Sequence, residues 1–459
     1  MAAHRAGIKH GDADISIGNR STHRHVSPPT TPTRTSAMTS VTGPLLDAHY
    51  QRSFGALAGY LPEDRSGLAA WHAVIREKAA QLCNDQGPGY ANQAVQDLAN
   101  LIDTNGIVCM YVTEAIDQTS AFTKNIKNIQ DMLEQLDVIC TTAPEYNVNK
   151  KVRVLFPMSA LFVDMMATPA GKALFRLEPF NEALRAILQT WAAYLDSQAS
   201  CSVLNRDPSI GWLGTAAIAE FKLADFVIDW DAEHGGFQSY NDFFHREIQA
   251  SCRPLAGEGD ASIITSPNDG TVYRIATDVQ QSAVFWIKEQ SYSLQDMLAN
   301  PDAALLQRFV GGTVVQIFLS GADYHRWHAP VDGVVTYKNI DGLLFSENED
   351  SSFDPDAGVT SQVYGAAVNN RGIVSITADD ARLGTVFVMP IGITEISSLT
   401  QTAANGQHVS KGDELGYFNY GGSTLCLVFE NSVSLNFGTL QPNQTIEVNA
   451  QLARLNTPV

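Results

Sequence analysis

Two histidines and a serine are the residues of this 459-residue chain whose types and spacing suit catalysis. His325 and His328 lie three residues apart, just after an apolar run. Such a pair suits general acid–base catalysis near neutral pH, or the ligation of zinc. Ser423 follows two glycines and precedes an apolar segment, and glycine permits close backbone approach and unusual backbone angles. Ser423 is therefore a candidate nucleophile, with the histidines as candidate acids and bases.

An acid that could orient one of these histidines occurs in each of two similar turns. Asp269 precedes Gly270 and Asp332 precedes Gly333, and both turns read Pro-x-Asp-Gly before an apolar segment. The pattern is typical of hairpin turns, in which Asp-Gly supplies a positive φ. A serine–histidine–acid arrangement needs one such carboxylate. The residues alone do not choose between Asp269 and Asp332.

The composition narrows the classes of partner. The chain has 30 basic and 49 acidic side chains, a net charge of −19. This charge opposes binding to nucleic acid and to an anionic membrane surface. No run approaches the roughly 20 apolar residues that span a bilayer. We therefore expect no nucleic-acid partner, no stable membrane anchor and a cytoplasmic location.

Three regions with different patterns indicate the organisation of the chain. Residues 1–43 are polar and rich in turn formers, which predicts a disordered arm. Residues 44–225 have apolar side chains at three- and four-residue steps, for example over 180–195, and predict a helical domain. Residues 226–459 hold short apolar runs between Asp-Gly and Gly-Gly turns, which predicts strands.

The fold class that follows is α+β, with a helical domain before a mainly antiparallel β sandwich or barrel. The catalytic candidates all lie in the β region. The strands expected there cover residues 313–319, 333–337, 372–376, 385–389 and 425–429.

Six motifs in a fixed order resemble those of the phosphatidylserine decarboxylase family. Their order, spacing and location agree over residues 237–430. The helical region and residues 324–330 and 391–397 are more similar still to a soluble fungal branch of that family, which includes L-tryptophan decarboxylase. The motifs are Asn-Asp-Phe-Phe-His-Arg at 241–246, Arg-Pro-Leu at 253–255, Ser-Pro-x-Asp-Gly at 266–270, His-x-x-His-x-Pro at 325–330, Lys-Gly-Asp-Glu-Leu-Gly-x-Phe at 411–418 and Gly-Gly-Ser-Thr at 421–424.

The resemblance implies a prosthetic group made from the chain itself. The Ser423 hydroxyl would attack the Gly422 carbonyl, and cleavage between residues 422 and 423 would leave a covalent pyruvoyl group, the pyruvate cofactor, at Ser423. The small chain 423–459 would remain as a partner of the large one. His328 would act as the base with Asp269 as its partner. His325 would protonate the product after a Schiff base with the substrate amine has lost CO₂.

The function expected from this resemblance is a self-processing, pyruvoyl-dependent decarboxylase of a free aromatic L-amino acid, with L-tryptophan giving tryptamine. It needs a small-molecule substrate and no metal, and a homo-oligomer is left open. One alternative keeps the mechanism but converts phosphatidylserine to phosphatidylethanolamine. Membrane-type members have Asn-Glu-Arg where this chain has Asn-Asn-Arg at 369–371, which argues against a phospholipid substrate.

Two further alternatives leave residues unexplained. A zinc-dependent hydrolase could use His325 and His328 with Asp332, but it gives no role to Gly422 and Ser423. A non-catalytic lipoyl- or biotinyl-like module over 411–418 lacks the expected lysine in a tight turn.

Overall fold

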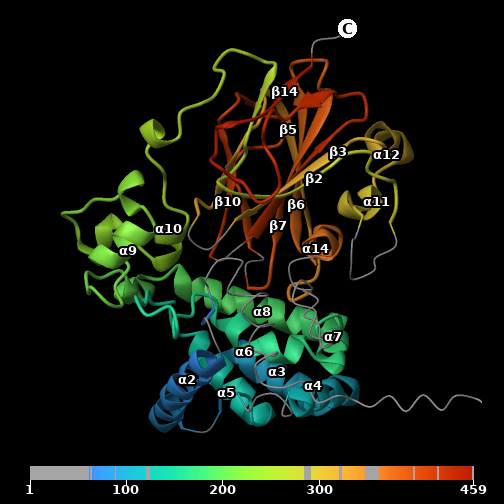
Figure 1. Ribbon diagram of the computed structural model, residues 1–459. Helices are drawn as coiled ribbons and strands as arrows, with labels where there is room; N and C mark the ends of the chain where they lie inside the picture. The colour runs from blue at the N-terminus through green and yellow to red at the C-terminus, as the bar shows by residue number, and fades with distance from the viewer. Residues whose placement is uncertain are drawn as a thin grey trace, which may run out of the picture. The chain divides into compact units, whose positions relative to one another are not determined.

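The computed structural model describes most of the chain after residue 60. The predicted arm, residues 1–43, and Gly422 of the predicted cleavage site lie outside the described residues. Within the described part, helices precede antiparallel strands (Figure 1), which confirms the α+β prediction. The described residues are 61–62, 65–87, 89–119, 125–283, 291–319, 323–346, 361–395, 398–420 and 423–456.

The helical region follows the apolar periodicity of its sequence. Thr168 illustrates why one helix stops and another starts, because its side chain accepts a hydrogen bond from the Gly171 N–H and Pro169 occupies the first turn. The helices here are α2 (Arg65–Gln86), α3 (Gln93–Thr104), α4 (Gly106–Thr119), α5 (Ile129–Ile139), α6 (Pro157–Met166), α7 (Pro169–Leu174), α8 (Glu178–Leu195), α9 (Thr215–Glu220) and α10 (Tyr240–Phe244), with short 3-10 turns at Gln198–Val203, Leu223–Asp225, Glu233–Gly236 and Ala250–Cys252.

An eight-stranded antiparallel sheet forms the centre of the β region in the described residues. Its strand order is β13 (Thr445–Ile446), β2 (Gly270–Ala276), β3 (Thr313–Leu319), β11 (Ser423–Phe429), β7 (Thr385–Gly392), β6 (Arg371–Ala378), β5 (Gly333–Ile340) and β9 (His408–Val409). Two three-stranded sheets join β1 (Ile263–Thr265), β14 (Gln451–Leu455) and β12 (Leu435–Asn436), and β4 (Arg326–His328), β10 (Glu414–Phe418) and β8 (Leu399–Gln401). Short helices α11 (Leu294–Met297), α12 (Ala303–Phe309) and α14 (Gln362–Val368) share an apolar core with one face of the central sheet.

The central strand β11 is buried on both faces. Leu425 and Leu427 belong to one apolar core, whereas Cys426 and Val428 belong to a second. A strand buried on both faces reads as a continuous apolar run rather than as an alternation. This explains why the apolar part of β11 was predictable from its composition.

The helices meet the sheet at the end where β7 finishes, as Figure 1 shows for α6 and α8. The Glu395 carboxylate, three residues beyond β7, accepts hydrogen bonds from the backbone N–H groups of Met158 and Ser159 in α6, at 3.1 and 2.9 Å. Asn181 of α8 accepts a hydrogen bond from the Leu344 N–H at 3.0 Å. These contacts hold the helical region against one end of the sheet.

The two Asp-Gly turns are not hairpin turns, and that prediction is wrong. β1 pairs with β14 and β2 with β3, so the first turn joins strands of different sheets. The second turn likewise leads from β4 to β5, which pair with other strands. The glycines are needed for close packing, since a Cβ on Gly270 would lie 2.3 Å from the Phe318 carbonyl oxygen and one on Gly333 2.3 Å from that of Thr377.

Candidate active site

Ser423 is the first residue of β11 and lies between the ends of two neighbouring strands. It pairs with Leu319, the last residue of β3, and with Gly392, the last residue of β7. Its side chain is fully buried, and its hydroxyl has no hydrogen-bond partner among the described residues. A buried hydroxyl without a partner is costly and therefore uncommon. A buried, unpartnered hydroxyl at this position is consistent with the prediction that Ser423 is the nucleophile and the residue from which the pyruvoyl group would be made.

The sheet topology brings the predicted residues to one end of the central sheet. β2 and β11 both run antiparallel to β3, so their first residues lie beside the last residues of β3. Asp269 immediately precedes β2, and Ser423 begins β11. The chain leaves β3 at Leu319 and reaches His325 six residues later. Ser423, Asp269 and His325 therefore belong to the same end of the sheet.

His325 is a fully buried side chain held between the helical and β parts of the chain. Its ring stacks on Phe244 of α10, with ring centroids 3.9 Å apart. Its backbone carbonyl accepts a hydrogen bond from the Phe418 N–H at 2.9 Å, five residues before Ser423. The imidazole is thus fixed next to the segment that leads to the predicted cleavage site.

His328, at the end of β4, has a partner at each ring nitrogen. Nδ1 lies 2.8 Å from the Gly412 carbonyl oxygen, and Nε2 lies 3.0 Å from the Tyr324 hydroxyl. A carbonyl oxygen only accepts, so Nδ1 carries the proton and Nε2 of the neutral ring accepts from Tyr324. Burial lowers the pKa of His328, opposed by the Gly412 hydrogen bond and by the charges of Glu414 and Asp269. The ring is therefore held as a neutral base.

Neither candidate acid forms a hydrogen bond with His328 in the described structure. The Asp269 carboxylate accepts two-pronged hydrogen bonds from Arg253, at 3.0 and 2.7 Å, and one from the Val448 N–H at 2.7 Å. Asp332 accepts a hydrogen bond from the Lys411 N–H at 2.7 Å. The acceptor that orients His328 is a backbone carbonyl, which leaves no side-chain signal in the sequence. Burial lowers the pKa of His328, and the negative charge of Asp269 opposes this shift.

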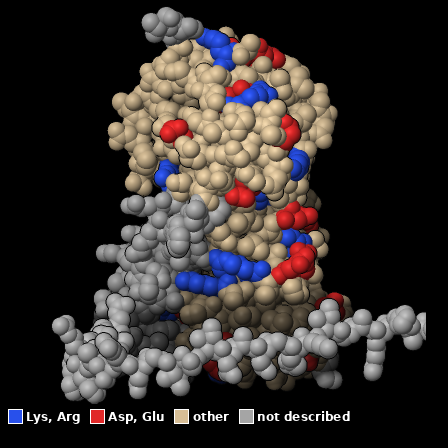
Figure 2. Space-filling view, turned by 90° about the vertical axis from the view of Figure 1, so that its right-hand side faces the viewer, with Lys and Arg blue, Asp and Glu red and all other residues tan. Residues whose placement is uncertain are grey.

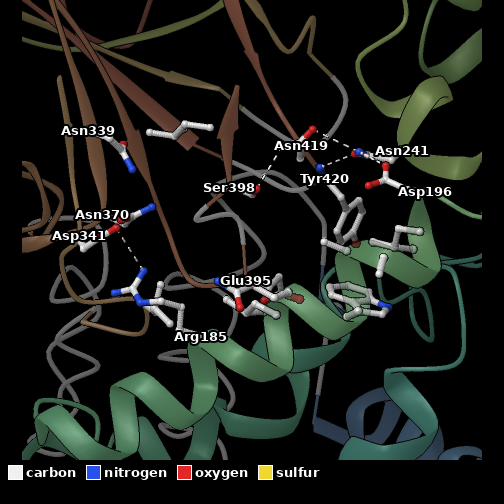
Figure 3. A pocket seen from close by; sticks show the side chains of 18 residues that line it. Arg185, Asp196, Asn241, Asn339, Asp341, Asn370, Glu395, Ser398, Asn419 and Tyr420 are labelled. Carbon is white, nitrogen blue, oxygen red and sulfur yellow. Dashed lines mark hydrogen bonds and ion pairs between the residues drawn. The ribbon is translucent and has the colours of Figure 1, made fainter. Parts of the chain in front are cut away.

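A cavity of about 410 Å³ lies between α8, the segment after β7 and residues 419–420 (Figure 3). Figure 3 shows Asp196, Asn241, Asn419 and Ser398 joined by hydrogen bonds along one side. Tyr420, three residues before Ser423, also lines the cavity, although Ser423 and the histidines do not. No role was predicted for these lining residues from the sequence, because they come from segments far apart in the chain.

Glu395 is the buried acid of this cavity. Burial raises its pKa to about 7, although hydrogen bonds from Ser159 and Met158 oppose that rise. The carboxyl group is bound to the first turn of α6, where backbone N–H groups point outward. It therefore ties a wall of the cavity to the helical region.

The described residues hold no group of three or more His, Cys, Asp and Glu side chains placed to bind a metal ion. No helix among the described residues has the length and apolar content to cross a bilayer. The face in Figure 2 mixes positive and negative side chains over its described residues.

Two family models match this chain, and both are described as phosphatidylserine decarboxylase. They cover residues 92–221 and 240–454. The chain is 34% identical to decarboxylase iboD of Amanita muscaria over 70% of its length and 99% of that protein. It is 29% identical to L-tryptophan decarboxylase of Psilocybe cubensis, over 84% of this chain and 92% of that one. Phosphatidylserine decarboxylase proenzyme 3 of Schizosaccharomyces pombe is 31% identical over 44% of this chain and 20% of its own length.

Proposed function

Since this chain belongs to the phosphatidylserine decarboxylase family, we propose that it is a self-processing, pyruvoyl-dependent decarboxylase of a free aromatic L-amino acid. The expected substrate is L-tryptophan and the expected products are tryptamine and CO₂. The observation that carries the proposal is the buried hydroxyl of Ser423, which begins the central strand and has no partner among the described residues.

Self-processing assigns a role to each predicted residue. The Ser423 hydroxyl gives its proton to His328, and its oxygen attacks the Gly422 carbonyl. The peptide bond between residues 422 and 423 is replaced by an ester between the Gly422 carbonyl and the Ser423 side-chain oxygen. Elimination then breaks the bond from this oxygen to Cβ of residue 423, which separates the two chains. Hydrolysis with loss of ammonia leaves the pyruvoyl group at residue 423. The neutral His328 suits the base, and Asp269 favours the protonated imidazole through its charge.

In turnover, the chain supplies binding and a proton. A pyruvoyl group at residue 423 provides the electron-withdrawing carbonyl that decarboxylation of an amino acid needs. His325, fixed by its stacking on Phe244, protonates the substrate carbon after CO₂ has left.

The choice of an amino acid over a phospholipid rests on coverage. The similarity to L-tryptophan decarboxylase of Psilocybe cubensis extends over 84% of this chain, helical region included. The similarity to the Schizosaccharomyces pombe phosphatidylserine decarboxylase covers 44% of this chain. The helical region supplies Trp191 and Asp196 to the cavity beside Tyr420. The helical region therefore forms part of this cavity.

The test is the intact mass of the denatured protein, with and without borohydride and L-tryptophan. We expect two chains divided between residues 422 and 423, the small one gaining the mass of the reduced amine or amino acid. Ser423→Ala should remain one chain and release no tryptamine. An uncleaved wild-type protein would contradict self-processing, whereas cleavage with activity only on phosphatidylserine would overturn the substrate.

A further inference from the structure

We propose that Asp332 is a positioning residue for the base of self-processing. Its carboxylate fixes the turn of residues 410–413, and the Gly412 carbonyl in that turn holds the imidazole of His328 in its working orientation. This inference rests on the proposed function, because it takes His328 as the base. It also assigns a role to the second Pro-x-Asp-Gly motif, whose acid has no other part in the proposed reaction.

The first observation is the contact between Asp332 and the turn. Oδ1 of Asp332 accepts a hydrogen bond from the backbone N–H of Lys411 at 2.7 Å. The next residue is Gly412, and its carbonyl oxygen lies 2.8 Å from Nδ1 of His328. The carboxylate thus binds the residue that immediately precedes the one that orients the base.

The second observation is that the Lys411 side chain anchors the same turn from the other side. Lys411 is only 7% exposed. Its ammonium group donates to the backbone carbonyls of Gly257, Asp260 and Ile263, at 2.7, 2.9 and 3.2 Å. An ammonium group has three donors, so these bonds use all of them. Lys411 is therefore held through its backbone by Asp332 and through its side chain by the segment that leads into β1.

The turn needs this support because a glycine carries the orienting carbonyl. Gly412 has a φ of +91°, which glycine adopts without a clash but does not prefer over other conformations. Contacts from outside the residue must therefore select this conformation. The N–H of Gly412 donates to the Ala329 carbonyl, and the N–H of Ala329 donates to the Asp413 carbonyl, both at 2.8 Å. These bonds tie the turn to the backbone next to His328, and Asp332 ties it to the following turn.

The position of the Gly412 carbonyl determines which nitrogen of His328 can act. A neutral imidazole carries its proton on either nitrogen, and the hydrogen bond of one nitrogen sets the state of the other. With the proton on Nδ1, directed at Gly412, Nε2 is the nitrogen that can take up a proton. A displaced carbonyl no longer selects this tautomer, so a smaller fraction of the protein holds a competent base.

The experiment compares the rate of self-cleavage of the full chain in three variants at one position. Asp332→Asn keeps an oxygen that can accept from the Lys411 N–H but removes the charge. Asp332→Glu keeps the charge but displaces the oxygen by one methylene group, and Asp332→Ala removes both. We expect the asparagine variant to cleave at near the wild-type rate, and the other two about tenfold more slowly, the effect of one lost orienting hydrogen bond.

Asp302→Ala is the matched control for stability. Its carboxylate also accepts a hydrogen bond from one backbone N–H, that of Leu305 at 2.9 Å, but at the start of α12. This variant loses a contact of the same kind and should cleave at the wild-type rate. Equal slowing in Asp302→Ala and Asp332→Ala would overturn the proposal, because it would show that any loss of such a contact suffices.

The pH profile supplies a readout that a loss of stability alone does not move. The Gly412 hydrogen bond raises the pKa of His328, so a weaker bond lowers that pKa. The acid limb of the cleavage rate should therefore shift to lower pH in Asp332→Ala and keep its place in Asp332→Asn. The other groups that act on His328 are unchanged in these variants: the Tyr324 hydroxyl at Nε2 and the charges of Glu414, Arg326 and Asp269.

The order of the two conservative variants decides the proposal even if alanine prevents folding. Asp332→Glu cleaving faster than Asp332→Asn would mean that the charge of Asp332, and not its contact with the turn, serves the base. Three variants with the wild-type rate would leave Asp332 without a part in processing and would equally overturn the proposal. A wild-type chain that stays uncleaved would instead overturn the proposed function, and that outcome is recognised without any variant.

Discussion

The side chain of Asn241 accepts a hydrogen bond from the backbone N–H of Tyr420 at 2.9 Å. Its amide nitrogen donates to Asp196 at the end of α8, at 2.6 Å, and to Asn419 at 3.2 Å. One buried asparagine thus connects the helical region to the segment that precedes the predicted cleavage site.

We expect Asn241→Ala to slow self-cleavage by tenfold or more. The variant removes the two hydrogen bonds that hold residues 419 and 420 and the one that ties Asn241 to Asp196. Processing requires the carbonyl of residue 422 to meet the serine hydroxyl in one geometry. The protein is synthesised in a cell-free system, and mass spectrometry then measures the rate at which the full chain is converted to two fragments. Asn431→Ala is the control, because its side chain also forms hydrogen bonds, here to the carbonyls of Gln307 and Val310, but lies beyond the opposite end of β11. Equal rates in the two variants would refute the role of Asn241.

Tyr324→Phe should move the acid limb of the self-cleavage rate to higher pH. Nε2 of neutral His328 accepts a hydrogen bond from the Tyr324 hydroxyl. Because this hydrogen bond stabilises the neutral ring, it lowers the pKa of His328. In the wild type, burial also lowers the pKa of His328, so the ring keeps its neutral form at a lower pH than an ordinary imidazole does. Without the hydroxyl, His328 gains its proton at a higher pH and cleavage declines sooner on acidification. Rates between pH 5 and 8 check this shift, and superimposable profiles would contradict it.

Glu395→Gln should remove a pH dependence of stability. Burial raises the pKa of Glu395 to about 7 from the ordinary 4.5, so between these values the folded state binds more protons than the unfolded state. The free energy of unfolding therefore falls as pH rises from about 4.5 to about 7, by something on the order of 3 kcal/mol, and stays level above. Urea unfolding of the wild type and the variant at pH 5 and 7.5 tests this. The prediction fails if the wild-type decline persists unchanged in the glutamine variant.

The strands were predictable where most of their residues are apolar. The strand predicted over residues 313–319 has the bounds of β3, because a run of apolar residues interrupted only by Gln316 follows two glycines and leaves few alternatives. β11 was predicted from residue 425, but it begins at Ser423. Two small polar residues at the start of a buried strand carry no apolar signal, although Ser423 itself was recognised by its motif.

The contacts of the site were less predictable than its residues. His328 was identifiable by type and spacing, but its orienting partner is the Gly412 carbonyl, which every residue type could provide. Glu395 and Ser159 are 236 residues apart, and no local pattern indicates that they meet. Pairing across such separations depends on how the helices pack on the sheet, which the periodicity of each segment alone does not specify.

Arg253→Leu should destabilise the protein by about 3 kcal/mol or more. Its guanidinium binds the Asp269 carboxylate in a two-pronged contact, and both side chains are only 9% exposed. Removing one member of a buried pair leaves the other charge uncompensated, which typically costs ~3–5 kcal/mol. Arg382→Leu is the matched control, since the Arg382 side chain is 47% exposed and water screens its pair with Asp380, so its loss should change the free energy of unfolding far less.

Adding Asp269→Asn to Arg253→Leu should restore part of this loss, because the double variant no longer buries an unpaired carboxylate. Urea unfolding of the single and double variants at pH 7 measures the coupling. The rate of self-cleavage in Arg253→Leu, Asp269→Asn and the double variant separates two roles of Asp269: its pairing with Arg253 and the effect of its charge on His328. If its charge favours proton uptake by His328, both variants that lack the carboxylate should cleave slowly, whereas Arg253→Leu, which keeps it, should cleave at near the wild-type rate once folded. Slow cleavage in Arg253→Leu alone would show instead that the guanidinium, and not the carboxylate, is what processing requires.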